Sequence, residues 1–243
     1  MALCCACVPL PDLDSDTLIA INRTSIVARS VFGAAHDVNN ALQIIGGSAD
    51  IMAQRPDDTT ATLRAVQRIR AQTDRAADVL RVLMDFARAG QPVESRVSLR
   101  QIAAQALTLR AHAIRRAGLT TAFDADTAVE ATVRGQRDQL LQAILNLVMN
   151  AEQALADRAG EPITVTVTAA PARVELTVMD RGAGIQADVV ERLFTPFVVS
   201  SASERLGIGL AVTRLIARSQ GGDVTIETGP AGTRAILSLP AVS

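Results

Sequence analysis

The feature that most constrains the fold of this chain is an apolar seam that continues over roughly four heptads near its start. Between about Ser15 and Arg55 there is no proline, and small or apolar residues recur in alternating steps of three and four. They are Ile21, Thr24, Ala28, Val31, Ala35, Val38, Leu42, Ile45, Ala49 and Met52. This spacing is typical of a helix that packs along its length against other helices.

A second helix with the same pattern follows directly. Pro56-Asp57-Asp58 ends the first helix and begins the next, which runs to Gly90-Gln91-Pro92. Its seam consists of Val66, Ile69, Thr73, Ala76, Leu80, Leu83 and Ala87. We expect each helix to exceed about 30 residues, or about 45 Å at 1.5 Å per residue. Because one hairpin cannot cover both seams, we expect a homodimer in which two hairpins form a four-helix bundle.

The pattern changes after Pro92, where shorter helical and strand-like runs are mixed. Helices are expected over Ser98–Arg116, Gln136–Arg158, Val189–Phe194 and Gly207–Gln220. Strands are expected over Thr120–Phe123, Ala131–Val133, Ile163–Thr168, Arg173–Met179, Val224–Thr228 and Thr233–Leu239, the last two joined by Gly229-Pro230-Ala231-Gly232. Because strands and helices do not alternate regularly, this half is expected to be an α/β sandwich. The predicted fold class is α+β, with a flexible tail over 1–15, a helical hairpin over 16–91 and the sandwich over 92–243.

Composition excludes several kinds of chemistry and partner. All 24 basic residues are arginine, so a phosphate-loop lysine or a Schiff base is impossible. A net charge of −1 and the lack of Trp and Tyr argue against a nucleic-acid partner. No apolar run reaches the roughly 18 residues of a membrane span, and no secretory signal is evident, so a cytoplasmic protein is expected. Cys4, Cys5 and Cys7 are interpreted as free thiols, with acylation or a metal shared between two chains as alternatives.

One of the two histidines lies in the first helix. His36 falls just beside the seam, so we expect it to be accessible and able to accept a phosphoryl group. Asp37 could take its proton, and Asn40 shares its helix face one turn later. The alternative is that His36 is an ordinary surface residue. The other histidine, His112, is expected to be a solvated helix residue.

The apolar helix near residue 145 carries amides at steps of four, which are Gln142, Asn146 and Asn150. Burying unpaired amides costs a few kcal/mol each, so this stripe needs partners. One interpretation is that it meets solvent or backbone groups. The other is that a side-chain carbonyl holds a hydrated Mg²⁺ beside phosphates.

Glycine-rich turns complete the set of candidate segments. Asp180-Arg181-Gly182-Ala183-Gly184-Ile185 follows a strand, where glycines allow close approach of a ligand and Asp180 could accept a hydrogen bond from an amine. Gly207-Ile208-Gly209-Leu210 opens a helix, and a helix N-terminus suits an anionic phosphate. Each turn alone could equally be an ordinary tight turn or helix start.

In this order, the segments resemble the sequence boxes of sensor histidine kinases. HDVNNAL is similar to their H box, NLVMNA to the N box, DRGAGI to the G1 box, LFTPF to the F box and GIGLAV to the G2 box. Gly232-Thr233 resembles the closing Gly-Thr of their ATP-binding domain. The resemblance covers about residues 20–240 and implies a dimerisation and phosphotransfer hairpin followed by a Bergerat-fold ATP-binding domain.

The resemblance also implies roles for individual residues. His36 would be the phosphoacceptor, Asp37 the general base, and Asn40 a residue for dephosphorylating the regulator. The ATP-binding residues would be Asn146, Asn150, Asp180, Gly182, Gly184, Ile185, Gly207, Gly209, Leu210 and Thr233, with Asn150 also the Mg²⁺ ligand. The implied cofactors are ATP and Mg²⁺. The implied partners are a second copy of the chain and the receiver domain of a response regulator, with a separate sensor protein as a further candidate.

The chain departs from the family pattern at several positions. Ala41 stands where many members have proline, which predicts a straighter helix. The lid over Val199–Leu206 is short, lacks the usual Thr-Lys pair and has Arg205 as its only basic residue. Fewer than about 20 residues precede the hairpin, so no sensor domain is expected before it. Two other functions stay open: a phosphotransfer or docking module with a non-functional ATPase half, and an ATP-driven conformational clamp.

Overall fold

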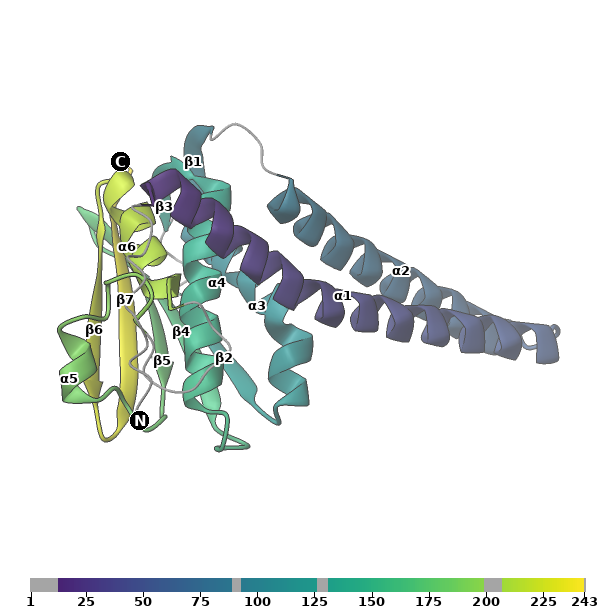
Figure 1. The fold of residues 1–243 in the computed structure, drawn as a ribbon. Helices are drawn as coiled ribbons and strands as arrows, with labels where there is room; N and C mark the ends of the chain where they lie inside the picture. Colours follow the sequence, from purple (N-terminus) through teal and green to yellow (C-terminus); the bar gives the residue numbers. More distant parts are fainter. Residues whose placement is uncertain (1–12, 89–92, 126–130, 199–206, 243) are drawn as a thin grey trace.

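A computed structural model describes residues 13–88, 93–125, 131–198 and 207–242, and shows a long helical hairpin that projects from an α/β domain (Figure 1). Helix α1 spans Ser15–Gln54 and α2 spans Thr59–Ala87. Asp14 caps α1 by accepting from the Thr17 N–H, and Asp58 caps α2 by accepting from the Ala61 N–H. Helix α1 continues without a break through Ala41, as expected. The expected length of α2 was slightly wrong, because it has 29 residues.

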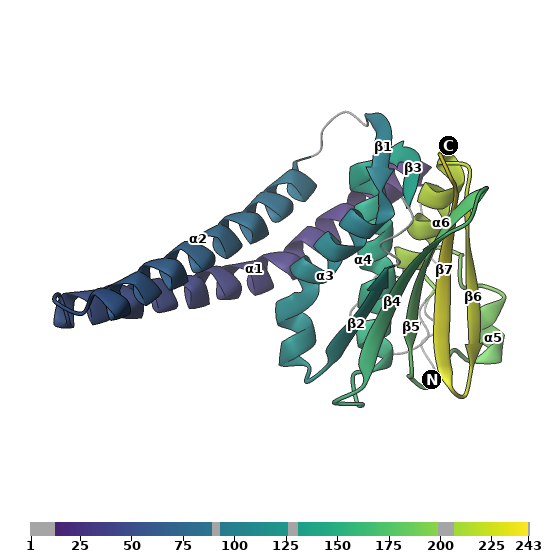
Figure 2. The same ribbon diagram turned by 180° about the vertical axis from the view of Figure 1, so that it is seen from behind.

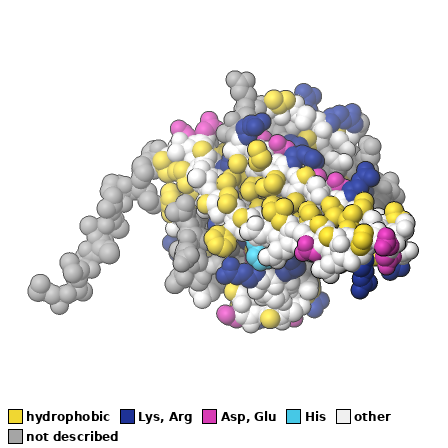
Figure 3. All heavy atoms as spheres, turned by 90° about the vertical axis from the view of Figure 1, so that its right-hand side faces the viewer, with side chains coloured by type: hydrophobic (Ala, Val, Ile, Leu, Met, Phe, Trp, Pro, Cys, Tyr) yellow, Lys and Arg dark blue, Asp and Glu magenta, His cyan; other side chains and the backbone are white. Residues whose placement is uncertain are grey.

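Apart from Leu83 of α2, the predicted seam is not the buried face of the hairpin within one chain. The buried residues of α1 are Leu18, Asn22, Ile26, Ser30, Ala34, Ala41 and Ser48. The seam residues Ile21, Val31 and Leu42 are exposed, as is Leu80 of α2. Figure 3 views the molecule from the hairpin end and shows apolar side chains gathered in a band over the hairpin.

The second half is built on a five-stranded sheet with the order β2-β4-β5-β7-β6. Its strands are β2 (Thr120–Ala125), β4 (Pro162–Ala169), β5 (Arg173–Asp180), β6 (Asp223–Gly229) and β7 (Gly232–Pro240). Strands β2 and β4 are parallel, and the other neighbours are antiparallel. Helices α3 (Leu99–Arg116), α4 (Arg137–Ala154) and α6 (Gly209–Ser219) lie on one side of the sheet (Figure 2). The expected α+β class, helical hairpin and α/β sandwich are confirmed.

Two elements differ from the expectation. Strand β1 (Glu94–Ser98), which the sequence reasoning missed, pairs antiparallel with β3 (Thr132–Gln136) in a separate two-stranded sheet. Val97 is the only apolar residue of β1 and its only buried one, so the sequence of β1 lacks the alternating apolar pattern of a strand. Helix α5 covers Ala187–Val190 rather than the expected Val189–Phe194, and turns and a bend follow it up to Phe197. The lid, Arg205 and the three cysteines lie outside the described residues.

The first half of α1 lies against the α/β domain beside α3, α4 and α6 (Figure 1). A buried ion pair stands at this junction. The Arg110 guanidinium of α3 donates to both carboxylate oxygens of Glu152 in α4, at 2.8 and 2.6 Å, and to the Arg29 carbonyl of α1 at 3.4 Å. Of the helices in the described ranges, none is long and apolar enough to cross a membrane.

Candidate functional site: a nucleotide pocket and an exposed histidine

A cavity of about 620 Å³ opens between α4, the turn after β5, the start of α6 and one side of α1. This volume is in the range of small-ligand pockets, which run from about 300 to 1,000 Å³. Nine of the ten residues expected to bind ATP line it. They are Asn146, Asn150, Asp180, Gly184, Ile185, Gly207, Gly209, Leu210 and Thr233.

Asp180 ends β5 beside this cavity and is 6% exposed. The Gly182 N–H donates to its Oδ1 atom at 2.8 Å, which fixes the carboxylate. Burial raises the pKa of Asp180 above its ordinary value of 3.8, against the opposing effect of the hydrogen bond from Gly182. A buried carboxylate at a pocket wall is suited to accept a hydrogen bond from a ligand amine.

The glycines around Asp180 are required by close packing. Gly184 has φ +73°, and a Cβ there would lie 2.2 Å from the Gly229 carbonyl oxygen. Gly182 does not line the cavity, which differs from the expectation of a pocket-shaping residue. A Cβ on Gly182 would lie 2.6 Å from the Ala154 carbonyl oxygen, so this glycine lets the turn pack against the end of α4.

The start of α6 forms the opposite wall. Gly207 has φ +66°, and its carbonyl accepts from the Phe197 N–H at 2.9 Å. Ile208, the N-cap residue of α6, makes no side-chain cap hydrogen bond. A Cβ at Gly209 would lie 3.3 Å from the Asn146 Oδ1 atom, so Gly209 brings α6 close to α4. A glycine-rich helix start of this kind suits an anionic group.

Gln142 and Asn146 of the amide stripe of α4 face α1 rather than solvent, and Asn150 lines the cavity. The Gln142 Nε2 group donates to the Ile19 carbonyl at 2.8 Å and to the Asn22 Oδ1 atom at 2.7 Å. Asn146 Nδ2 also donates to Asn22 Oδ1, at 2.9 Å, and Asn22 Nδ2 donates back to Asn146 Oδ1 at 3.1 Å. Sequence reasoning missed Asn22. The sequence signal that could have identified it is its spacing: Asn22 lies four residues from both Leu18 and Ile26, so the three share one helix face, and that face is buried.

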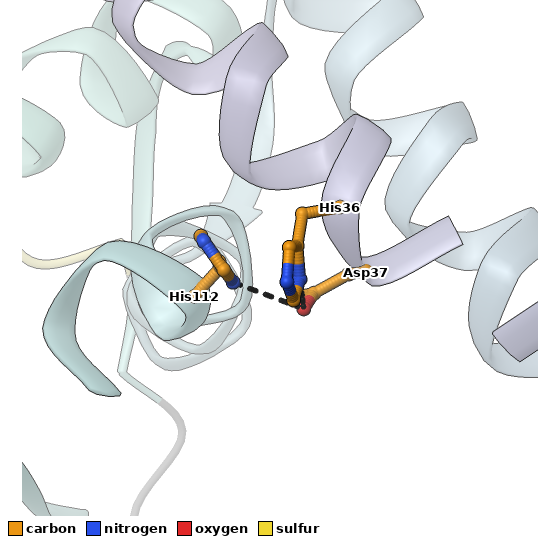
Figure 4. A group of neighbouring side chains, drawn as sticks. All are labelled: His36, Asp37 and His112. Carbon is orange, nitrogen blue, oxygen red and sulfur yellow. Dashed lines mark ion pairs between the residues drawn. The ribbon is translucent and has the colours of Figure 1, made fainter. Parts of the chain in front are cut away.

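His36 is exposed, as expected, with 51% of its side chain accessible. Asn40 Nδ2 lies 3.0 Å from His36 Nδ1, and the Asp37 Oδ1 atom lies 4.0 Å from the same nitrogen. Asp37 also contacts α3, where Arg115 Nη2 lies 2.9 Å and His112 Nδ1 lies 3.6 Å from its Oδ1 atom. Figure 4 shows the two imidazoles side by side, with 4.0 Å between ring centroids.

The interpretation of His112 as a solvated residue is wrong. Its side chain is 15% exposed, and it packs on His36 from another domain. Burial is the main cause that lowers the pKa of His112, followed by the neighbouring His36. The helix period alone could not show this contact, because the partner lies 76 positions away in the sequence.

His36 does not line the cavity, whereas Asn22, Ser25, Ile26 and Arg29 of the same helix do. Arg29 is the nearest of these residues along the helix, and seven positions separate it from His36, which is about 10 Å along an α-helix. The structure therefore brings the predicted ATP-binding residues together, and separately brings His36, Asp37 and Asn40 together.

Comparison with known proteins shows the family of the chain. Residues 135–243 match the family described as histidine kinase-, DNA gyrase B-, and HSP90-like ATPase. The chain is 33% identical over 226 residues to the C4-dicarboxylate transport sensor protein DctB of Rhizobium meliloti (strain 1021), covering 91% of this chain and 36% of DctB. The chain carries the core of a sensor histidine kinase. It is also 30% identical over 197 residues to the sensor histidine kinase ZraS of Escherichia coli (strain K12), covering 81% of this chain and 41% of ZraS.

Solved structures of histidine kinases share the fold. The catalytic domain of ThkA matches with a TM-score of 0.55 and 24% identity, over 61% of this chain and 97% of that domain. ThkA in complex with the response regulator TrrA matches with a TM-score of 0.54 and 23% identity, over 90% of this chain and 63% of that one. The sensor histidine kinase core described here spans well under half the length of DctB and ZraS.

Proposed function

We propose that this chain is an ATP-dependent protein histidine kinase that phosphorylates itself on His36 and passes the phosphoryl group to an aspartate of a response-regulator receiver domain. The observation that carries the proposal is the pairing of two sites in one chain. One is an exposed histidine flanked by Asp37 and Asn40, and the other is a cavity lined by the N, G1 and G2 box residues.

The cavity residues suit a nucleotide by their chemistry. Asp180 would accept a hydrogen bond from the adenine amine, and the α6 start would face the phosphates. Asn150, which lines the same cavity from α4, would hold Mg²⁺ through its side-chain oxygen. Mg²⁺, when bound, would neutralise phosphate charge, as divalent ions do in phosphoryl transfer.

In the proposed reaction a ring nitrogen of His36 attacks the γ-phosphorus of ATP. The nitrogen–phosphorus bond forms, the bond from the γ-phosphorus to the β–γ bridging oxygen breaks, and ADP leaves. The ring proton passes to the Asp37 carboxylate. A positioned base of this kind is worth roughly 10²–10⁴-fold in rate.

This reaction requires His36 to reach a nucleotide cavity that it does not line here. Either the ATPase half moves along its own hairpin, or the cavity serves the His36 of a second copy. The exposed seam supports the second copy, because Val31, Leu42 and Leu80 would be covered in a dimeric bundle. We therefore include a homodimer through the hairpin in the proposal.

Asn40 is proposed to act in the reverse direction, by orienting water against the phosphoaspartate of a docked receiver. Its amide lies one helical turn from His36 and contacts the ring nitrogen. Asn40→Ala should retain autophosphorylation and lose regulator dephosphorylation. Asn39→Ala is a matched control, because Asn39 is exposed on the same helix.

The test uses the purified chain with γ-labelled ATP and Mg²⁺, and the label is examined for acid lability. The kinase proposal expects acid-labile label on the wild type and none on His36→Gln, with nucleotide binding by calorimetry unchanged in that variant. A chain that binds no ATP or ADP at millimolar concentration would instead be a phosphotransfer or docking module.

A further inference from the structure

Three metal-ligating side chains from two domains converge beside the phosphoacceptor. His36 and Asp37 come from α1, and His112 comes from α3 (Figure 4). One ligand atom from each lies within 4.8 Å of the others. Nothing in the proposed phosphoryl transfer uses His112, so this convergence needs a separate explanation.

The spacing is close to that of a metal site. The His112 Nδ1 to Asp37 Oδ1 distance is 3.6 Å, and the His36 Nδ1 to Asp37 Oδ1 distance is 4.0 Å. A tetrahedral Zn²⁺ with bonds of about 2.0–2.1 Å places its ligand atoms about 3.3 Å apart. The His36 and His112 ligand atoms lie within 4.8 Å of each other, so both side chains would have to move toward Asp37 to close the site around an ion. Two imidazoles and one carboxylate with an open fourth position are a ligand set that Zn²⁺ favours.

The surroundings also contain two groups that a metal would have to displace. Arg115 Nη2 lies 2.9 Å from the Asp37 oxygen, and Asn40 Nδ2 lies 3.0 Å from His36 Nδ1. The Arg115 side chain is about half exposed, so it can turn into solvent without leaving a buried charge unpaired. Arg115 therefore acts as a competitor for the same carboxylate, and its removal should favour the metal.

We propose that His36, Asp37 and His112 bind one divalent transition-metal ion of the Zn²⁺ class, which joins the hairpin to the ATPase half. The ion would use Asp37 and His112 as its more buried ligands and the exposed His36 as its third. Mg²⁺ should not compete, because it prefers sites made of oxygen ligands.

If the proposed function is correct, this ion blocks phosphorylation. A metal on His36 Nδ1 leaves the ring proton on Nε2, which then has no lone pair for attack on phosphorus. A metal on Nε2 occupies that nitrogen directly. In both cases Asp37 is no longer available as a base. The inhibition rests on the proposed function, but the binding of the metal does not.

The test measures metal binding to the full chain in which Cys4, Cys5 and Cys7 are replaced by serine, because thiolates would otherwise bind Zn²⁺ themselves. Zn²⁺ is titrated against a chromophoric chelator, and Co²⁺ is used as a spectroscopic substitute. We expect one ion per chain and a loss of affinity of about tenfold or more in His112→Gln. Arg115→Gln should bind the ion more tightly than the parent.

Nucleotide binding and circular dichroism, measured on the same samples, show whether each variant is folded. An affinity that is equal in the parent and in folded His112→Gln would overturn the site. So would an Arg115→Gln variant that binds more weakly than the parent. If His112→Gln does not fold, two other measurements test the site. Weaker binding by Arg115→Gln, or a Co²⁺ spectrum of the parent that lacks imidazole coordination, would overturn it.

Activity separates the two proposals. Zn²⁺ should reduce autophosphorylation of the parent, and it should reduce autophosphorylation of His112→Gln by a smaller factor. A chain that binds Zn²⁺ but never labels would contradict the kinase and leave the site standing. A chain that labels normally and binds no Zn²⁺ would contradict the site alone.

Discussion

Replacing Asn22 by alanine should both destabilise this protein and strengthen its nucleotide binding. Asn22 is buried between α1 and α4, where it exchanges two hydrogen bonds with Asn146 and accepts a third from Gln142. After the change, Gln142 Nε2 keeps the Ile19 carbonyl, and Asn146 Nδ2 keeps the Gly209 carbonyl. The Asn146 Oδ1 atom loses the bond from Asn22.

The magnitude follows from that one oxygen. A buried polar group left without a partner costs about 1–3 kcal/mol. The free energy of unfolding should fall by this amount, and the melting temperature by about 2–4 °C for each kcal/mol in a chain of this size. The Asn146 Oδ1 atom, no longer held by Asn22, would be free to face the cavity, while Asn146 Nδ2 stays on the Gly209 carbonyl. Loss of about 1.4 kcal/mol of competing hydrogen bonds corresponds to about tenfold tighter nucleotide binding.

The assay combines urea denaturation with a titration of ADP followed by calorimetry. Asn39→Ala makes the same chemical change at an exposed position of α1 and should alter neither quantity. Unchanged stability of Asn22→Ala would show that the amide network is not formed. Lower stability together with weaker nucleotide binding would refute the competition between Asn22 and nucleotide for Asn146.

Three further changes test other parts of the structure. Asp180→Asn should abolish nucleotide binding yet raise the melting temperature, and by more near neutral pH than near about pH 4. The sign follows because burial raises the pKa of Asp180 above 3.8, so stability falls as pH rises from the unfolded pKa through the raised native pKa. Equal gains in melting temperature at both pH values, measured by scanning calorimetry, would contradict it. Arg110→Met should lower the free energy of unfolding in urea by up to about 3–5 kcal/mol, because it leaves the largely buried Glu152 unpaired, and adding Glu152→Met should restore much of the loss. Leu42→Asp should convert a dimer to a monomer in light scattering, because Leu42 is 56% exposed in the single chain; a monomeric wild type at micromolar concentration would rule out this dimer.

Local patterns in the sequence predicted nine of the residues that line the cavity, but not the wall that α1 contributes. Asp180 ends a strand, Gly184 lies in the turn that follows, and Gly207 and Gly209 lie at the start of a helix, so their roles depend on neighbours a few residues away. The heptad spacing likewise predicted both hairpin helices and the turn at Pro56. Backbone preferences of this kind act over short distances and can be read from single segments.

Contacts between distant segments could not be predicted in this way. Asn22 meets Asn146 across 124 positions, and His112 meets His36 from another domain. Spacing also did not distinguish which face of α1 is covered within the chain, since the polar residues Asn22, Ser30 and Ser48 are buried whereas Leu42 is exposed. These outcomes depend on how the hairpin lies on the ATPase half, which no local pattern determines.

The central claim is that the cavity of this chain supplies a phosphoryl group to His36. The most direct measurement incubates the purified protein with γ-labelled ATP and Mg²⁺, digests it at alkaline pH and locates the label by peptide mapping. We expect one acid-labile phosphoryl group, carried by the peptide that contains His36, and no label in Asp180→Asn. Acid-stable label on a serine or threonine peptide, or label on His36 that persists in Asp180→Asn, would contradict it.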